Sequence, residues 1–243
     1  MSDRIAVQLK EVSKKYILHH EKPTLVENIL TRKWNEEFWA LKNINLEIKK
    51  GESVGVIGSN GSGKTTLLEI IAGVTTQTEG EVKTFGKSVS LIDLGAGFHP
   101  ELTGEENIYL NCLLIGMSKL EIKSRIKKII SFADIGQFID APFYTYSEGM
   151  KLRLGFSVIA HSNPDIVLLD ENMAIGDQEF GLRTQKKIQE FIKKGKTLVI
   201  VSHLLDLVEK NCGRVIWLNN GSILEQGEGK KLVQKYLHES SRK

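Results

Sequence analysis

The sequence predicts an α/β fold with a largely parallel sheet, because a glycine-rich loop joins a buried strand to a helix and further buried strands follow. The loop, residues 58–66, reads GSNGSGKTT and fits the pattern G-x-x-x-x-G-K-[ST]. Residues 53–57 before it are typical of a buried strand, and residues 66–72 after it of a helix. A glycine-rich turn without a ligand is the alternative interpretation.

This arrangement suits a polyphosphate. Successive backbone N–H groups and a helix N-terminus together bind phosphate oxygens without their water shell. We expect Lys64 to reach the β- and γ-phosphates of a nucleotide and the Thr65 hydroxyl to bind Mg²⁺.

Composition is ordinary for a globular chain. The 243 residues are 41% hydrophobic and 26% charged, with a net charge of +3, which allows one large domain or two small lobes. The lysines are scattered and are interpreted as solvated faces, with a weak attraction to an anionic membrane surface as the alternative. No cluster of basic and aromatic residues indicates a nucleic-acid partner.

The cysteines and the apolar stretches suggest a protein of the cytoplasm. Cys112 and Cys212 fit no metal or redox spacing. The N-terminus lacks a signal peptide pattern, and the longest uncharged apolar-rich stretch, residues 107–117, is too short to span a bilayer. A role at a membrane would therefore need another protein to hold the chain there.

The N-terminal part predicts strands around an insertion. Alternating apolar residues predict an edge strand at 6–12 and a second strand at 40–48. Between them, residues 17–38 include an amphipathic segment whose Thr24-x-x-Glu27 fits a helix capping box. Two short strands are expected within residues 80–92.

The remaining chain predicts a helical lobe and then more strands. A 3.6-residue period dominates residues 103–154, with breaks near 116–118, 136 and 142. The further elements are parallel strands at 165–169 and 197–201, a helix at 182–193, a hairpin at 215–226 closed by Asn220-Gly221, and a helix at 230–239. No internal repeat occurs, which predicts a single nucleotide cassette.

Two carboxylates follow the strand at 165–169. Strand ends place Asp170 and Glu171 at the carboxyl edge of the sheet, beside the phosphate loop. There Asp170 would hold Mg²⁺, and Glu171 would polarise the water that attacks the γ-phosphate. A helix N-cap pair is the alternative.

Residues 144–150, YTYSEGM, resemble the signature loop of ABC-transporter ATPases, with Ser147 and Gly149 matching and Glu148 and Met150 departing from it. In that family this loop binds the γ-phosphate held by a partner subunit. The resemblance therefore implies a head-to-tail homodimer that sandwiches two ATP molecules.

Three further residues follow the order of that family. Asp177, in AIGD, resembles the loop at the dimer seam. His203 resembles the switch histidine that contacts the γ-phosphate, and Tyr16 the aromatic residue that stacks on adenine. The resemblance thus implies catalytic roles for Glu171, His203 and Lys64 and metal binding by Thr65 and Asp170. The residues expected to bind ATP are Tyr16, Ser59, Asn60, Gly61, Ser62, Gly63, Lys64, Thr65, Thr66, Ser147, Gly149 and Asp177.

The resemblance covers residues 5–227. It implies a P-loop NTPase core with an antiparallel β-subdomain and a helical subdomain at about residues 100–158. Residues 1–243 would form one nucleotide-binding domain ending in a short helix at 228–243, without a carbohydrate-binding domain.

The stretch 91–107, LIDLGAGFHPELTGEEN, points to one branch of that family. It lacks the glutamine that most transporter ATPases place near Leu94 or Gly95, and Asp93 is the nearest polar candidate to replace it. The stretch resembles ATPases of bacterial polysaccharide exporters, which serve lipid-linked O-antigen, capsule or teichoic acid. The motif at residues 146–150 and the insertion at 17–38 also resemble that branch.

Two aromatic groups are candidate contact surfaces. We expect residues 94–103 to touch a permease or the lipid boundary, with Phe98 and His99 exposed. Packing of Phe98 on the helical lobe is the alternative. Trp34, Phe38 and Trp39 could form an aromatic edge near the membrane or a cover over the adenine pocket.

Together these observations predict a peripheral ATPase subunit at the cytoplasmic face of the inner membrane, using ATP and Mg²⁺. Two copies would dock on two copies of an integral membrane permease and drive export of a lipid-linked polysaccharide, with O-antigen favoured. A transporter ATPase for another substrate is one alternative. A soluble ABC-type switch is the other, and it usually has tandem cassettes or a long coiled-coil insertion.

Overall fold

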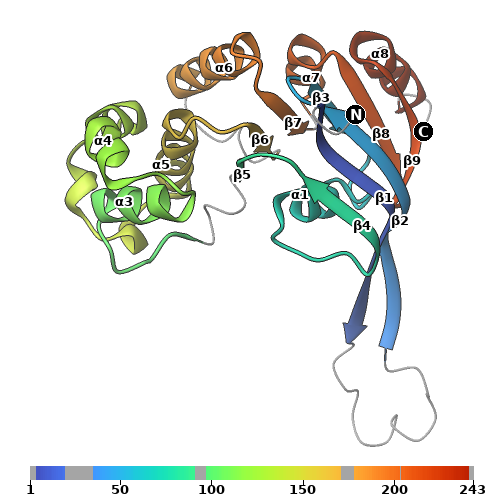
Figure 1. The fold of residues 1–243 in the computed structure, drawn as a ribbon, viewed down its shortest axis with the longest axis horizontal. Coiled ribbons are helices and arrows are strands. Elements are labelled where there is room, and N and C mark those ends of the chain that lie inside the picture. The colour runs from blue at the N-terminus through green and yellow to red at the C-terminus, as the bar shows by residue number, and fades with distance from the viewer. Residues whose placement is uncertain (1–3, 20–34, 91–96, 171–177, 203, 241–243) are drawn as a thin grey trace, which may run out of the picture.

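A computed structural model describes residues 4–19, 35–90, 97–170, 178–202 and 204–240. The chain forms two β-sheets, with a group of helices to one side of them (Figure 1).

The glycine loop follows one of the inner strands of the larger sheet. Its strand order is β5-β6-β7-β3-β8-β9, with β9 antiparallel to β8 and the other neighbours parallel. Their bounds are β3 Ser53–Ile57, β5 Ser88–Ser90, β6 Ile166–Leu169, β7 Thr197–Val201, β8 Arg214–Asn219 and β9 Ser222–Glu228. Every residue of β6 and β7 is buried, as expected where both faces of a parallel sheet are covered.

The smaller sheet is antiparallel, in the order β2-β1-β4. Its strands are β1 Ile5–His19, β2 Asn35–Lys49 and β4 Glu79–Thr84. The predicted edge strand at 6–12 is therefore wrong, because β1 lies in the middle and pairs on both sides. Alternation shows that one face is buried, here by Ala6, Val7, Leu9 and Val12, but it does not show how many neighbours the backbone pairs with.

Seven α-helices and two short 3₁₀ helices complete the described part of the chain. The bounds are α1 Lys64–Ala72, α3 Gly104–Leu114, α4 Lys119–Ala133, η3 Gly136–Asp140, η4 Phe143–Thr145, α5 Glu148–His161, α6 Gln178–Lys193, α7 Leu205–Asn211 and α8 Gly229–Ser240. We call α3 to α5, together with both 3₁₀ helices, the helical lobe. The sequence analysis did not predict α7. Among these described helices, none is both long and apolar enough to cross a membrane.

Two capping boxes set the ends of helices in this lobe. The Thr103 hydroxyl accepts from the Glu106 backbone N–H at the start of α3, and Ser118 and Glu121 make the same contact at the start of α4. The second box explains the break that the sequence shows near residue 116. The predicted box at Thr24 lies outside the described residues.

Two hydrophobic cores lie on opposite faces of the larger sheet. Ile166 and Leu168 belong to the core that contains α1 and the smaller sheet. Val167 and Leu169 belong to the core that continues into the helical lobe. Because successive side chains of a strand point to opposite faces of the sheet, β6 contributes to both hydrophobic cores.

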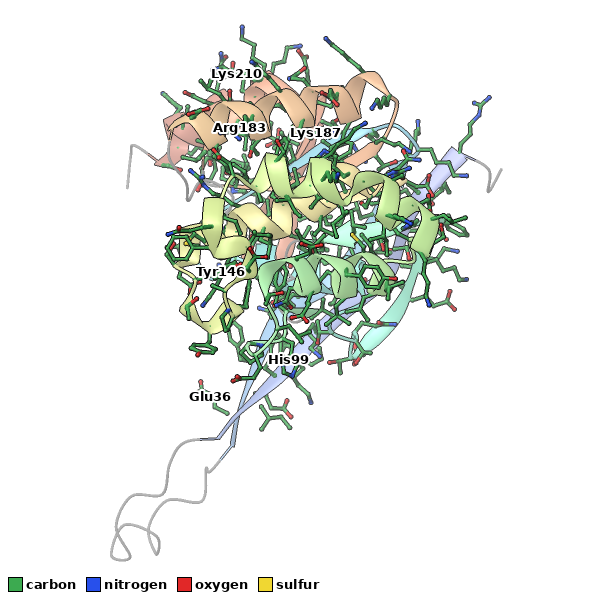
Figure 2. The ribbon with its side chains drawn as sticks, turned by 90° about the vertical axis from the view of Figure 1, so that its left-hand side faces the viewer. Glu36, His99, Tyr146, Arg183, Lys187 and Lys210 are labelled. Atoms are coloured by element: carbon green, nitrogen blue, oxygen red, sulfur yellow. The ribbon has the colours of Figure 1, made fainter. Side chains whose placement is uncertain are left out.

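The helical lobe is attached to α6 by rings and an ion pair. Phe180 of α6 meets Phe132 and Phe156 edge to face, at centroid distances of 5.8 and 6.2 Å. Beside them, Arg183 donates to the Asp134 carboxylate at 2.6 Å, and this hydrogen bond lowers the pKa of Asp134. Figure 2 shows Arg183 on α6 above the lobe.

Both cysteines are structural. Cys112 and Cys212 are free and buried. Burial raises the pKa of Cys112 to about 11 and that of Cys212 to about 12, so both thiols stay protonated and unreactive near neutral pH.

Candidate functional site

The backbone of the phosphate loop is packed so closely that it requires glycine at two positions. At Gly63, the N-cap of α1 with φ 101°, a Cβ atom would lie 2.5 Å from the Ala40 carbonyl oxygen. At Gly58 a Cβ atom would collide with the Leu218 carbonyl oxygen. The two glycines of the sequence pattern are thus required by contacts with β2 and β8.

A turn far along the chain holds this loop from behind. Asn220 and Gly221 both have positive φ, 46° and 80°, which confirms the predicted Asn-Gly hairpin turn. The Gly221 N–H donates to the Ser62 carbonyl at 3.1 Å, and its carbonyl accepts from the Lys42 N–H at 2.8 Å. The turn therefore connects the loop to β2. This role could not be predicted from the local sequence, because both partners lie far away in the chain.

Lys64 folds back over the loop. Its ammonium group donates to the carbonyls of Gly58 at 2.9 Å and Ser59 at 3.0 Å, and only 6% of the residue is exposed. The charge is thus held at the centre of the loop, beside its backbone N–H groups. Within the described residues the buried Ser62 hydroxyl has no hydrogen-bond partner.

A hollow of about 250 Å³ opens in front of the loop. It is lined by Phe38, Ala40, Asn60, Gly61, Gly63, Lys64, Thr65 and Thr66. The structure therefore brings together most of the predicted phosphate-binding residues, and Thr65 is exposed among them. The lining includes the Lys64 ammonium and the side chains of Asn60 and Thr66, and such hydrogen-bond donors suit an anion with several oxygens.

The carboxyl edge of the larger sheet positions the predicted metal ligand. β6 ends at Leu169, and Asp170 follows as a buried residue. Because β7 alone separates β6 from β3, Asp170 and the loop after β3 leave the same edge of the sheet. Glu171, Asp177 and His203 lie outside the described residues, as does Asp93.

The predicted signature residues lie on the other lobe. Ser147 is the N-cap of α5, and its hydroxyl accepts from the Met150 N–H at 3.3 Å. Neither Ser147 nor Gly149 is among the described residues that line the hollow. Around Gly149 the nearest atom to an added Cβ is 3.9 Å away, so packing within this chain does not explain the glycine.

Tyr16 and Phe38 face each other across β1 and β2. The Lys14 ammonium lies 5.0 Å from the Tyr16 ring centroid, and Tyr16 does not line the hollow. Phe38 does line the hollow, and of the two interpretations considered for this residue this position favours a cover over the nucleotide pocket. Trp34 lies outside the described residues.

The prediction that Phe98 is exposed is wrong. Its ring stacks on Phe143 of the helical lobe, with centroids 4.5 Å apart and planes at 22°, because this apolar ring gains more from burial than from exposure. His99 is exposed, as predicted.

Two buried asparagines of α3 fix the backbone of this segment. Asn107 accepts from the His99 N–H at 2.8 Å and donates to the His99 carbonyl at 3.0 Å. Asn111 donates to the Gly97 carbonyl at 3.3 Å. The sequence analysis missed both, although asparagine at buried positions of a helix is itself a signal of such backbone contacts.

A glycine loop between a central parallel strand and a helix, with a carboxylate at the same sheet edge, defines a P-loop nucleotide-binding protein. The family model described as "ABC transporter" matches residues 41–174, more than half of the chain. The chain belongs to this family and is an ATP-binding subunit of the ABC transporter type.

Curated relatives extend the match over nearly the whole chain. The O-antigen export system ATP-binding protein RfbB of Klebsiella pneumoniae is 40% identical over 95% of this chain and 96% of its own length. The teichoic acids export ATP-binding protein TagH of Listeria innocua serovar 6a is 44% identical over 97% of this chain and 71% of its own length.

Solved structures confirm the predicted fold class. The ATP-binding cassette MJ0796, in a dimeric post-hydrolysis state bound to ADP and Pi, is 27% identical with a TM-score of 0.73, covering 91% of this chain and 98% of that one. An ATP-binding subunit of an ABC transporter, at 19% identity and a TM-score of 0.75, shares the fold over 95% of this chain and 93% of its own.

The contact between Gly221 and the loop yields a stability prediction. Gly221→Ala places a Cβ atom 2.8 Å from the Ala40 carbonyl oxygen, in addition to the strain of a positive φ. Gly136→Ala is the control, because Gly136 also has positive φ, 57°, with nothing within 4 Å. We expect chemical denaturation to show Gly221→Ala as less stable than the control by about 1–3 kcal/mol. Equal free energies of unfolding for the two variants would show that close packing of Gly221 against β2 does not affect stability.

Proposed function

We propose that this protein is the ATPase subunit of an ABC exporter that moves a lipid-linked polysaccharide, with O-antigen favoured, across the bacterial inner membrane. The phosphate loop supports the assignment as an ATPase. Its glycines pack against β2 and β8, and Lys64 lies over it. The cargo is proposed from the relatives named for export of O-antigen and teichoic acid.

The nucleotide would lie in the hollow in front of the loop. Backbone N–H groups of residues 59–66 and the Lys64 ammonium would bind the phosphates, replacing the carbonyl contacts that this ammonium makes now. Thr65 and Asp170 would bind Mg²⁺, since hydroxyl and carboxylate oxygens are ligands that this cation accepts. When bound, Mg²⁺ supplies positive charge at the transferring phosphoryl group.

Hydrolysis would need a base and a sensor at the same sheet edge. We assign the base to Glu171, which directly follows Asp170, and contact with the γ-phosphate to His203, which follows β7. Lys64 would stabilise the negative charge that develops on the γ-phosphoryl oxygens.

A homodimer would complete the site. Ser147 is exposed at the N-terminus of α5, away from the phosphate loop of its own chain, and the surroundings of Gly149 leave room for an incoming group. A head-to-tail partner would bring Ser147, Gly149 and Asp177 to the γ-phosphate. The dimeric state named for a solved relative supports this arrangement.

An exposed apolar surface on the helical lobe fits the permease. Tyr109 and Leu113 share one face of α3, and Leu114 at the end of α3 and Leu120 at the start of α4 are exposed as well. Leu114 and Leu120 are 64% and 81% exposed, and large exposed apolar surfaces mark contacts with other proteins. Docking there would place the chain as a peripheral protein on the cytoplasmic face of the inner membrane.

Residues 1–243 would act as one cassette, with about residues 100–158 as its helical subdomain and α8, Gly229–Ser240, as its C-terminal helix. Teichoic acid export is the second candidate, since the Listeria relative is 44% identical and the Klebsiella relative 40%.

Two variants distinguish ATP binding from ATP hydrolysis. Glu171→Gln keeps the phosphate contacts but removes the base, so ATP binding should persist while hydrolysis falls about 10²–10⁴-fold. Lys64→Ala should abolish nucleotide binding, or at least hydrolysis. Lys83→Ala, an exposed lysine of β4 paired with Glu81, is the control and should match the unaltered protein. Near-normal turnover of Glu171→Gln, measured by phosphate release, would reject Glu171 as the base.

Permease docking predicts a variant that is defective only in the complex. Leu114→Glu should leave basal ATP hydrolysis within about twofold, because exposed substitutions seldom disturb the fold. It should reduce co-purification with the permease, because a carboxylate would be desolvated at the contact. Leu237→Glu on α8, 50% exposed, is the matched control. Equal permease recovery for both variants would exclude the α3 surface as the docking site.

A further inference from the structure

A second hollow, of about 270 Å³, lies where the helical lobe meets α6. Its lining is rich in cationic side chains that are far apart in the sequence. The lining residues are Arg125, Lys128, Ala160, His161, Asn163, Lys187, Phe191 and Lys194. Figure 2 shows Lys187 between α6 and the lobe below it. The fold thus gathers lysines that appear as separate solvated pairs in the sequence.

Positive charge exceeds negative charge around this hollow. Arg125, Lys128, Lys187 and Lys194 supply four cations, and no carboxylate is among the described lining residues. Two acidic side chains approach from outside the lining. Glu121 lies 3.7 Å from Arg125, and Glu190 lies 3.0 Å from Lys187 and 3.9 Å from Lys194. Two carboxylates therefore face four cations.

Hydrogen bonds to carbonyl groups at helix ends account for only part of this positive charge. Arg125 donates to the His161 carbonyl at 2.7 Å and so satisfies the last turn of α5. Among the described residues, neither Lys128 of α4 nor Lys187 of α6 donates a hydrogen bond to a carbonyl at a helix end, and Lys187 pairs only with Glu190.

His161 adds a titratable donor. Its Nδ1 lies 2.8 Å from the Ser157 carbonyl, and a carbonyl can only accept, so the proton of the neutral ring sits on Nδ1. Burial lowers the pKa of His161, and Lys187, Arg125 and Lys128 lower it further. An anion would oppose these effects, raise the pKa of His161 and allow Nε2 to donate as well.

We propose that this hollow binds a small phosphate-bearing anion, of the diphosphate class or a phosphate headgroup. Guanidinium and ammonium donors converge from α4 and α6, which suits a multiply charged group with several oxygens. The hollow is too small for a peptide helix, whose diameter is about 10 Å. The site is separate from the phosphate loop and does not depend on the proposed function.

Occupancy would tie the two lobes together. Arg125 and Lys128 belong to the helical lobe, and Lys187 belongs to the core helix α6. An anion bound by both sides would add a bridge beside the contact between Arg183 and Asp134. A phosphate compound bound in the hollow would therefore join the helical lobe to α6.

The test measures pyrophosphate binding by titration calorimetry in chains that all carry Lys64→Ala, which suppresses the phosphate loop. Lys128→Ala and Lys187→Ala each remove a lining cation, and Lys127→Ala and Lys186→Ala are the controls from the adjacent positions. We expect each lining variant to weaken binding about tenfold, the value of one charge-assisted hydrogen bond, and each control to leave it unchanged. Thermal unfolding of each variant confirms that it is folded.

Nuclear magnetic resonance of the His161 ring supplies an independent readout. Pyrophosphate at constant ionic strength should raise the pKa of His161, and the rise should shrink in Lys128→Ala. Vesicles containing phosphatidylglycerol form the second arm. Binding of vesicles with the same dependence on Lys128 and Lys187, but weak binding of pyrophosphate, would support the site and identify a lipid headgroup as the source. Equal effects of lining and control variants, or an unchanged His161 in both arms, would overturn the proposal.

Discussion

The close contact between the phosphate loop and the backbone of β2 and β8 is the constraint on which the site depends. Gly63 lies against the Ala40 carbonyl, and Gly58 against the Leu218 carbonyl. Gly221 closes the arrangement by binding both Ser62 and Lys42. A loop held on three sides keeps its N–H groups oriented before any ligand arrives, and such preorganisation is what makes a polar site effective. The smaller sheet therefore supports the loop as well as covering one core.

The two lobes divide the proposed chemistry. The core holds the loop and Asp170 at one sheet edge, and the helical lobe carries Ser147 on the N-terminus of α5. Phe180 and Arg183 attach the lobe to α6 through a small set of rings and one ion pair. The hydrophobic core also continues from the larger sheet into the lobe, so the two lobes are packed against each other beyond this contact.

Local patterns predicted the parts of this fold that local sequence determines. The glycine loop, the two buried strands and the Asn220-Gly221 turn follow from periodicity and turn chemistry. The central position of β1, the packing of Phe98 on Phe143 and the support of the loop by Gly221 depend on partners distant in the chain, which no local pattern encodes. The capping boxes at Thr103 and Ser118 were visible in the sequence and were missed. The roles of Glu171, Asp177 and His203 stay predictions.

The central claim is that ATP hydrolysis here drives polysaccharide export. The most direct measurement replaces the native copy in the source cell with Glu171→Gln, then compares surface polysaccharide with lipid-linked glycan retained inside. We expect loss of the surface polymer together with accumulation of the lipid-linked form. Unchanged surface polysaccharide without internal accumulation would contradict it.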